Sequence, residues 1–83
     1  MKMRLRIRYF GSASDDAGTS EETIEIPDGT GIKSVHDKLS EMHPAIGKRW
    51  NNLLIAVNQS YVSGDAAVKN GDEIAIFPAV SGG

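Results

Sequence analysis

The strictest pattern in this chain is the alternation of apolar and basic residues from Met3 to Tyr9. A strand places successive side chains on opposite faces, so a period of two predicts a strand with one buried face. The inward side chains are expected to be Met3, Leu5, Ile7 and Tyr9, and the outward ones Arg4, Arg6, Arg8 and Phe10. Any fold for this chain must therefore contain a sheet with one face against a core.

Other segments predict further strands and one main helix. Strands are expected at 23–26, 53–57 and 73–77, with a short strand beginning at Tyr61. The helix follows Thr30, a plausible N-cap, and ends near Pro44, which cannot continue it. Its apolar face is expected to contain Ile32, Val35, Leu39 and Met42. This order predicts an α+β fold, with a mixed sheet of four or five strands packed on one main helix. The first and last strands are expected to be central and parallel.

The connections are predicted from turn residues. Residues 11–22 are small and polar, which indicates a flexible loop. Asn58-Gln59 is expected to form a turn, and Asn70-Gly71 a tight hairpin turn in which both residues tolerate positive φ. At 83 residues the chain is expected to be one domain, 1–77, followed by a flexible tail, 78–83, that ends in Gly82-Gly83.

Composition excludes several classes of function. The chain has no cysteine, which excludes a disulfide framework, a thiolate zinc site and a cysteine nucleophile. A net charge of −2 gives no reason to expect nucleic acid as a partner. No apolar run suits a membrane span or a signal peptide, so we expect a cytoplasmic protein with no membrane partner. So small a chain favours a carrier, adaptor or subunit over an enzyme with its own pocket.

Two histidines could suggest a metal site, but a structural role is expected for both. His36 and His43 are seven residues apart, and no third ligand lies near them in the sequence. Trp50 is expected to contribute packing. We therefore predict no metal site.

The last fourteen residues, 70–83, resemble the C-terminus of the small subunit of molybdopterin synthase. In that family a Gly-Asp-Glu turn leads into the last strand and a Phe-Pro-x-Val-Ser/Thr-Gly-Gly tail, and 71–83 has this form. Residues 56–59 and 7–10 are also similar to family segments. The resemblance implies a β-grasp, ubiquitin-like fold. One departure is clear: where the family has a short helix with a leucine, an arginine and a glutamate, this chain has Ala13, Ser14 and Asp15, so we expect that helix to be lost.

The resemblance also implies a chemistry for Gly83. A C-terminal carboxylate is an anion at neutral pH and must be activated before it can react. In the family, a ubiquitin-activating-type adenylating enzyme uses ATP to adenylate this carboxylate, and sulfur then replaces AMP to give a thiocarboxylate. The large subunit of molybdopterin synthase receives that sulfur in a heterotetramer of two small and two large subunits. The chain itself is then a carrier, not an enzyme, and binds no cofactor.

The residues expected to meet these partners fall into two groups. A glycine pair without side chains can thread a narrow channel, so the tail residues Pro78, Val80, Ser81 and Gly82 are expected to bind the partner that receives Gly83. Phe10, Tyr61, Phe77 and Arg8 are expected to form a binding surface on the open face of the sheet. The arginine row on that face could meet an acidic partner, although a solvated row is the more common case.

Other functions stay open at this point. Related ubiquitin-like proteins use the same terminal glycine pair to modify other proteins. A carrier for thiamine synthesis or tRNA thiolation, or an inert binding module with a dispensable end, would also fit.

Overall fold

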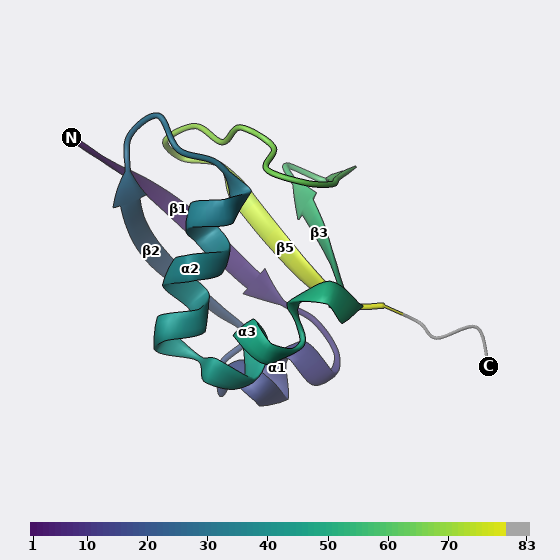
Figure 1. The fold of residues 1–83 in the computed structure, drawn as a ribbon. Coiled ribbons are helices and arrows are strands. Elements are labelled where there is room, and N and C mark those ends of the chain that lie inside the picture. The colour runs from purple at the N-terminus through teal and green to yellow at the C-terminus, as the bar shows by residue number, and fades with distance from the viewer. Residues whose placement is uncertain (80–83) are drawn as a thin grey trace.

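The structure, a computed structural model, describes residues 1–79 and contains one mixed sheet of five strands (Figure 1). The strands are β1 (Lys2–Tyr9), β2 (Glu21–Pro27), β3 (Leu53–Val57), β4 (Ser60–Val62) and β5 (Glu73–Pro78). Their order in the sheet is β2-β1-β5-β3-β4. β1 and β5 pair in parallel in the interior of the sheet, and the other neighbouring pairs are antiparallel. The expected arrangement of the first and last strands is confirmed.

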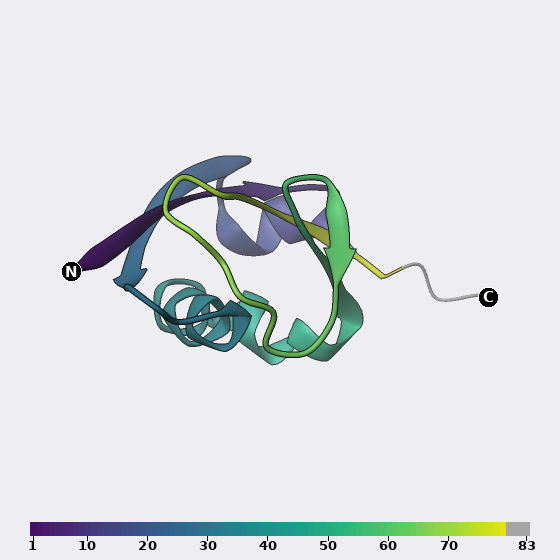
Figure 2. The same ribbon diagram turned by 90° about the horizontal axis from the view of Figure 1, so that it is seen from above.

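The helices gather on one side of this sheet and leave its other face open (Figure 2). They are α1 (Ser12–Ala17), α2 (Ile32–Met42) and α3 (Pro44–Lys48), followed by the short 3-10 helix η1 (Trp50–Asn52). This two-layer α+β architecture is the β-grasp, ubiquitin-like fold expected from the sequence. None of the helices among residues 1–79 has the length and apolar character needed to cross a bilayer.

The alternation in β1 builds the centre of the core. Exposed and buried residues alternate without a break along this strand. Leu5 and Ile7 are fully buried, and Ile7 and Tyr9 pair with Ile74 and Ile76 of β5, which are also fully buried. Apolar burial of this kind supplies most of the free energy that holds the two layers together.

The end of the main helix differs from the sequence prediction. Val35 and Leu39 are fully buried as expected, but Met42 is 38% exposed, so its assignment to the core was wrong. The helix ends at His43 as expected, and Pro44 starts the separate helix α3. Ile46 of α3 is fully buried and belongs to the core.

Thr30 is not the N-cap of α2. The cap residue is Gly31, which makes no side-chain cap bond, and the Thr30 hydroxyl instead donates to the carbonyl of Pro27, 2.7 Å away. Asp65, from the loop before β5, accepts the backbone N–H of Lys33 at 2.9 Å. The Asp65 carboxylate therefore caps the first turn of α2, a role that was expected of the Thr30 hydroxyl. The β-bridge between Gly31 and Ala67 brings the Asp65 loop to the start of the helix.

The loop expected over residues 11–22 contains α1, so that prediction was wrong, as was the expected loss of a helix at this place. Ala13 and Ala17, four residues apart, face the core of the protein. Gly18 ends the helix with the left-handed conformation typical of a C-cap. A six-residue helix is too short to be stable alone, so tertiary packing of the two alanines holds it.

The two predicted turns had different outcomes. Asn58 and Gln59 have φ values of 49° and 73° and join β3 to β4 as a two-residue hairpin loop, which confirms that turn. At Asn70-Gly71 only Gly71 has a positive φ, and the turn leads from a loop into β5 rather than joining two strands, so the hairpin prediction was wrong. The Asn70 side chain serves another purpose, because its Oδ1 accepts the N–H of Arg4.

Candidate functional site

The place where the chain leaves the sheet is set by the end of β5. Pro78 is the last residue of β5 and pairs with Leu53 of β3. The next residue, Ala79, donates its backbone N–H to the carbonyl of Asn52 at 2.8 Å. The predicted tail residues Val80, Ser81 and Gly82, and the predicted reactive residue Gly83, lie outside the described residues. Their roles stay predictions, and the structure establishes where the segment that carries them begins.

A cluster of apolar side chains covers one half of the open sheet face, next to that point. The rings of Phe10 and Phe77 are stacked, with centroids 4.5 Å apart and planes 11° apart. The ring of Tyr61 lies 6.0 Å from that of Phe77 and is tilted by 57°. The structure thus brings together three residues that the sequence placed on this face. Their role in binding a partner is not tested by this geometry and stays a prediction.

Leu54 belongs to the same surface and was missed. It pairs with Phe77 across the β3–β5 ladder and is 44% exposed. The sequence signal was hidden because 53–57 is a continuous apolar run without alternation. We call Phe10, Leu54, Tyr61 and Phe77 the aromatic patch. An exposed apolar patch of this kind is typical of a protein-binding surface.

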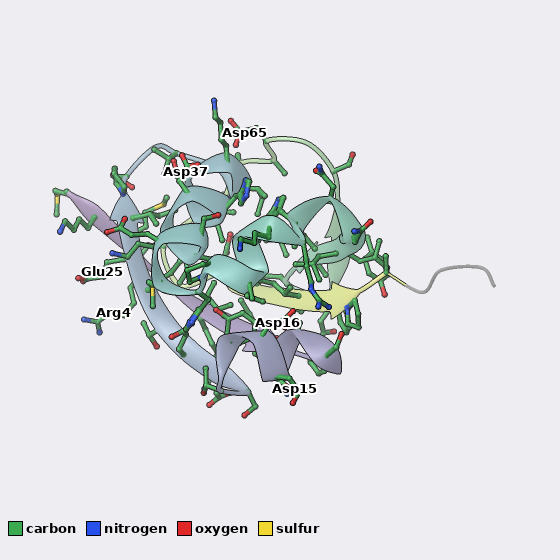
Figure 3. All side chains as sticks on the ribbon, turned by 60° about the horizontal axis from the view of Figure 1, so that its bottom comes forward. Arg4, Asp15, Asp16, Glu25, Asp37 and Asp65 are labelled. Carbon is green, nitrogen blue, oxygen red and sulfur yellow. The ribbon has the colours of Figure 1, made fainter. Side chains whose placement is uncertain are left out.

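The arginine row occupies the other half of the open face, over β1. Arg8 lies 5.2 Å from the centre of the Phe10 ring and 3.7 Å from a carboxylate oxygen of Glu73. Arg6 lies 3.9 Å from the same carboxylate. Arg4 and Glu25 face each other across β1 and β2 at 3.8 Å (Figure 3). These ion pairs are long and exposed to water, so each adds little stability. Within residues 1–79, the contact of Arg8 with Phe10 joins this row to the aromatic patch.

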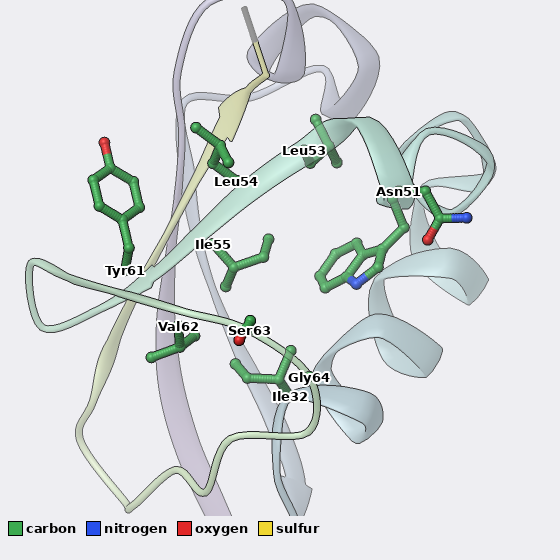
Figure 4. A pocket seen from close by; sticks show the side chains of 10 residues that line it. Ile32, Asn51, Leu53, Leu54, Ile55, Tyr61, Val62, Ser63 and Gly64 are labelled. Carbon is green, nitrogen blue, oxygen red and sulfur yellow. The ribbon is translucent and has the colours of Figure 1, made fainter.

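A pocket opens beside the aromatic patch, at the edge of the sheet formed by β4 (Figure 4). Its volume is about 430 Å³, and most of the side chains around it are apolar, including Trp50, Ile55 and Val62. Leu54 and Tyr61 also line it, so the pocket and the patch form one apolar surface. The lining carries no titratable group apart from the Tyr61 phenol, so it suits an apolar contact rather than acid–base chemistry.

One partly buried polar cluster was not foreseen. The Tyr9 hydroxyl donates to a carboxylate oxygen of Glu22, and Nε2 of His43 lies 2.6 Å from that same oxygen. Burial, then the hydrogen bond and the charge of Glu22, raise the pKa of the Tyr9 phenol well above its ordinary value. The cluster ties β1, β2 and the end of α2 together, and it lies in the core layer, away from the open face. Its role is structural.

The other histidine also makes a packing contact. The ring of His36 stacks on Trp50, with centroids 4.6 Å apart and planes 12° apart. Among residues 1–79, no three histidine or acidic side chains are grouped so that they could hold a metal ion. The contacts of His36 and of His43 are those of structural residues.

Comparison with known proteins gives consistent matches over almost the whole chain. A sequence model described as the ThiS family matches residues 7–83. The molybdopterin synthase sulfur carrier subunit of Chlamydomonas reinhardtii is 35% identical over 83 residues, which span 98% of this chain and all of that protein. The human protein of the same name is 31% identical, over 96% of this chain and 94% of that protein.

Solved structures give the same fold. A putative molybdopterin converting factor subunit 1 from Pyrococcus furiosus superposes with a TM-score of 0.85 and 29% identity, over 94% of this chain and 99% of that one. Small archaeal modifier protein 1 of Haloferax volcanii has a TM-score of 0.84 at 21% identity, over 94% and 99% of the two chains. A chain in the complex of subunits 1 and 2 of the Helicobacter pylori molybdopterin-converting factor has a TM-score of 0.70 at 23% identity, over 98% and 100%. At such identities the last two establish the fold alone.

Proposed function

This chain belongs to the ThiS family, and from that membership we propose that it is the sulfur carrier subunit of a molybdopterin synthase, with the carboxylate of Gly83 as its working group. The observation that carries the proposal is the nearly full-length similarity to proteins of that name, together with the family match that extends to residue 83. The geometry supports it, because the interior strand β5 ends just before the last described residue, Ala79, next to an exposed apolar surface.

The chemistry proposed for Gly83 has two steps. The carboxylate attacks the α-phosphate of ATP in an adenylating enzyme, which releases pyrophosphate and forms an acyl adenylate. A sulfide equivalent then attacks the acyl carbon and AMP leaves, which gives a thiocarboxylate. The partner must exclude water during both steps, because water would hydrolyse the adenylate. The carrier supplies the acyl group and the partner supplies the pocket, so the chain needs no cofactor of its own.

We also propose two protein partners for the same surface. One is a ubiquitin-activating-type adenylating enzyme, and the other is a molybdopterin synthase large subunit, in an assembly of two small and two large subunits. The aromatic patch fits both, since an apolar centre with a charged rim, here Arg8 and Glu73, is the usual anatomy of a protein interface. Sharing one surface would make the two partners compete, so the carrier would leave one before it binds the other.

The test is to incubate the chain with ATP, a verified adenylating enzyme and a sulfide source. Intact-mass measurement should show the replacement of one oxygen by one sulfur, and the variant without Gly83 should show no change. A chain that stays unmodified beside a known carrier that is modified in the same mixture would falsify the proposal.

One alternative use of Gly83 is the modification of other proteins. Its support is the fold shared with the small archaeal modifier protein, which is weaker than the full-length similarity to carrier subunits. Covalent adducts in cell extracts that disappear when Gly83 is deleted would favour that use.

A further inference from the structure

The last described residues pass between two other segments of the chain, one before α1 and one at the end of η1. We propose that these contacts form a clamp, made of Gly11, Asn52, Pro78 and Ala79, that fixes the direction in which the chain leaves the sheet. On this proposal Gly11 is a positioning residue for the reaction at Gly83. The effect of the clamp on the reaction rests on the proposed function, whereas the clamp itself can be measured separately.

Gly11 forms the first side of the clamp. It has φ 56° and ψ −136°, a conformation that residues with a Cβ rarely adopt. An added Cβ would lie 3.1 Å from Cγ and 3.4 Å from Cδ of Pro78, closer than ordinary van der Waals contact for the first of these. The backbone of residue 11 therefore lies directly against the proline ring, and only glycine combines this conformation with this approach.

Asn52 forms the second side. Its carbonyl accepts the N–H of Ala79 at 2.8 Å, one residue beyond the last β3–β5 pair, Leu53 with Pro78. The ladder between the two strands is thus extended by one bond past the strand end. With φ of Pro78 restricted by its ring, the path of the chain at residues 78 and 79 is held from both directions.

The two sides are linked to each other. The N–H of Asn52 donates to the carbonyl of Arg49 at 2.7 Å, and Nε of Arg49 lies 3.6 Å from a carboxylate oxygen of Asp16 in α1. Asp16 lies on the side of α1 that faces the other helices, whereas Asp15 lies on the outer side (Figure 3). The short helix α1 therefore carries Gly11 at one end and the partner of Arg49 further along, which keeps both halves of the clamp in register.

A fixed starting direction matters for a reaction at a chain end. A partner that must insert the terminus into a channel loses less conformational freedom if the root of the segment is already aimed. Loosening the root should therefore weaken productive binding and raise KM. It should leave kcat unchanged, because the bound carboxylate of Gly83 reacts as before.

The experiment compares Gly11→Ala with Gly18→Ala in the full-length chain. Both glycines flank α1 and have positive φ, but a Cβ at Gly18 would meet nothing within 4 Å. Gly11→Ala is the more strained substitution, because Gly18 has the left-handed helical angles φ 75° and ψ 12°, whereas the ψ of −136° at Gly11 lies outside that region. Only Gly11→Ala also meets Pro78, and a Pro78→Ala background, which removes the contact but not the backbone strain, separates the two causes. Hydrogen exchange of the Ala79 amide, compared with that of Ile76 in the interior of β5, is measured by NMR. KM and kcat for adenylation are measured on the same samples.

Gly11→Ala is expected to speed exchange at Ala79 severalfold relative to Ile76 and to raise KM severalfold at unchanged kcat, whereas Gly18→Ala does neither. Replacing Pro78 by alanine removes the two ring atoms in the contact, so Gly11→Ala should have little further effect on KM in a Pro78→Ala background. Equal Ala79 exchange in the two glycine variants would overturn the clamp. A wild-type chain that is never adenylated would overturn the proposed function instead, and the exchange data would still decide on the clamp.

Discussion

The ring of Phe10 lies flat against the ring of Phe77, and this stack joins the end of β1 to the end of β5. Phe77 is followed by Pro78 and Ala79, so the aromatic patch and the start of the C-terminal segment share one strand. A protein that covers the patch is therefore placed beside the segment that leads to Gly83. The position of the patch therefore favours a partner that binds the patch and receives the C-terminal segment at the same time.

Tyr61→Ala should weaken binding to both proposed partners while leaving the fold intact. The Tyr61 side chain is 69% exposed, so its loss should change the free energy of unfolding by less than about 0.5 kcal/mol. At the centre of an interface, loss of a tyrosine costs about 1–2 kcal/mol of binding free energy or more. Titration calorimetry with each partner measures the effect. Met42→Ala is the control, because Met42 is also exposed but lies on a helix on the other side of the sheet. Equal affinities for the two variants would exclude the patch as the binding surface.

Leu39→Ala and Met42→Ala should lower the free energy of unfolding by different amounts, because only Leu39 is buried in the core. Leu39 is fully buried, so its truncation should lower the free energy of unfolding by about 2–5 kcal/mol. Met42 is partly exposed, and its truncation should cost less than about 1 kcal/mol. Urea denaturation followed by circular dichroism gives both values. Similar costs would mean that Met42 packs into the core in solution.

The strands could be predicted because each carries a local signal. The alternation of β1 fixed which residues face the core, and the same parity placed Phe10 on the open face. The turn at Asn58-Gln59 could be predicted because few residues accept two successive positive φ values. Phe10 and Phe77 of the aromatic patch followed from these local patterns and Tyr61 from the family resemblance, whereas Leu54 was missed.

Several other missed features depend on contacts between distant segments. The helix α1 has no strong pattern beyond two alanines and a final glycine, and packing alone stabilises it. Asp65 caps a helix that begins more than thirty residues before it. The Tyr9 hydroxyl finds Glu22 and His43 only after β1, β2 and α2 have assembled. Periodicity cannot reveal such partners, because it describes one segment at a time.

Asp65→Ala should destabilise the start of α2 more than Thr30→Ala does. The Asp65 carboxylate accepts the N–H of Lys33, and loss of such a cap costs about 1 kcal/mol. Hydrogen exchange at the Lys33 amide should become faster in Asp65→Ala and stay unchanged in Thr30→Ala, because the Thr30 hydroxyl bonds a carbonyl outside the helix. Asp65→Asn keeps an acceptor oxygen and should retain most of the protection. Faster exchange of the Lys33 amide in Thr30→Ala, but not in Asp65→Ala, would show that Thr30 caps the helix after all.

The Tyr9 hydroxyl should make stability fall at alkaline pH. Its pKa is raised in the folded state, so the stability linked to its protonated form is fully present below the unfolded pKa, about 10, and is lost as the pH rises further. Tyr9→Phe removes this titration, so its free energy of unfolding should depend less on pH above about 10. At neutral pH the free energy of unfolding of the same variant should be lower by about 1 kcal/mol, because the hydrogen bond that Tyr9 donates to Glu22 is lost.

Tyr61→Phe is the matched control for this pH dependence, because it removes the chain's other phenol, which is exposed. The two variants share every titratable group other than the two phenols, so the difference between their curves isolates Tyr9. Free energies of unfolding from urea titrations at several pH values between about 7 and 11 should fall for Tyr61→Phe as for the wild type and fall less for Tyr9→Phe. Parallel curves for the two variants would mean that the Tyr9 phenol ionises as easily in the folded chain as in the unfolded one, and that the bond to Glu22 does not hold its proton.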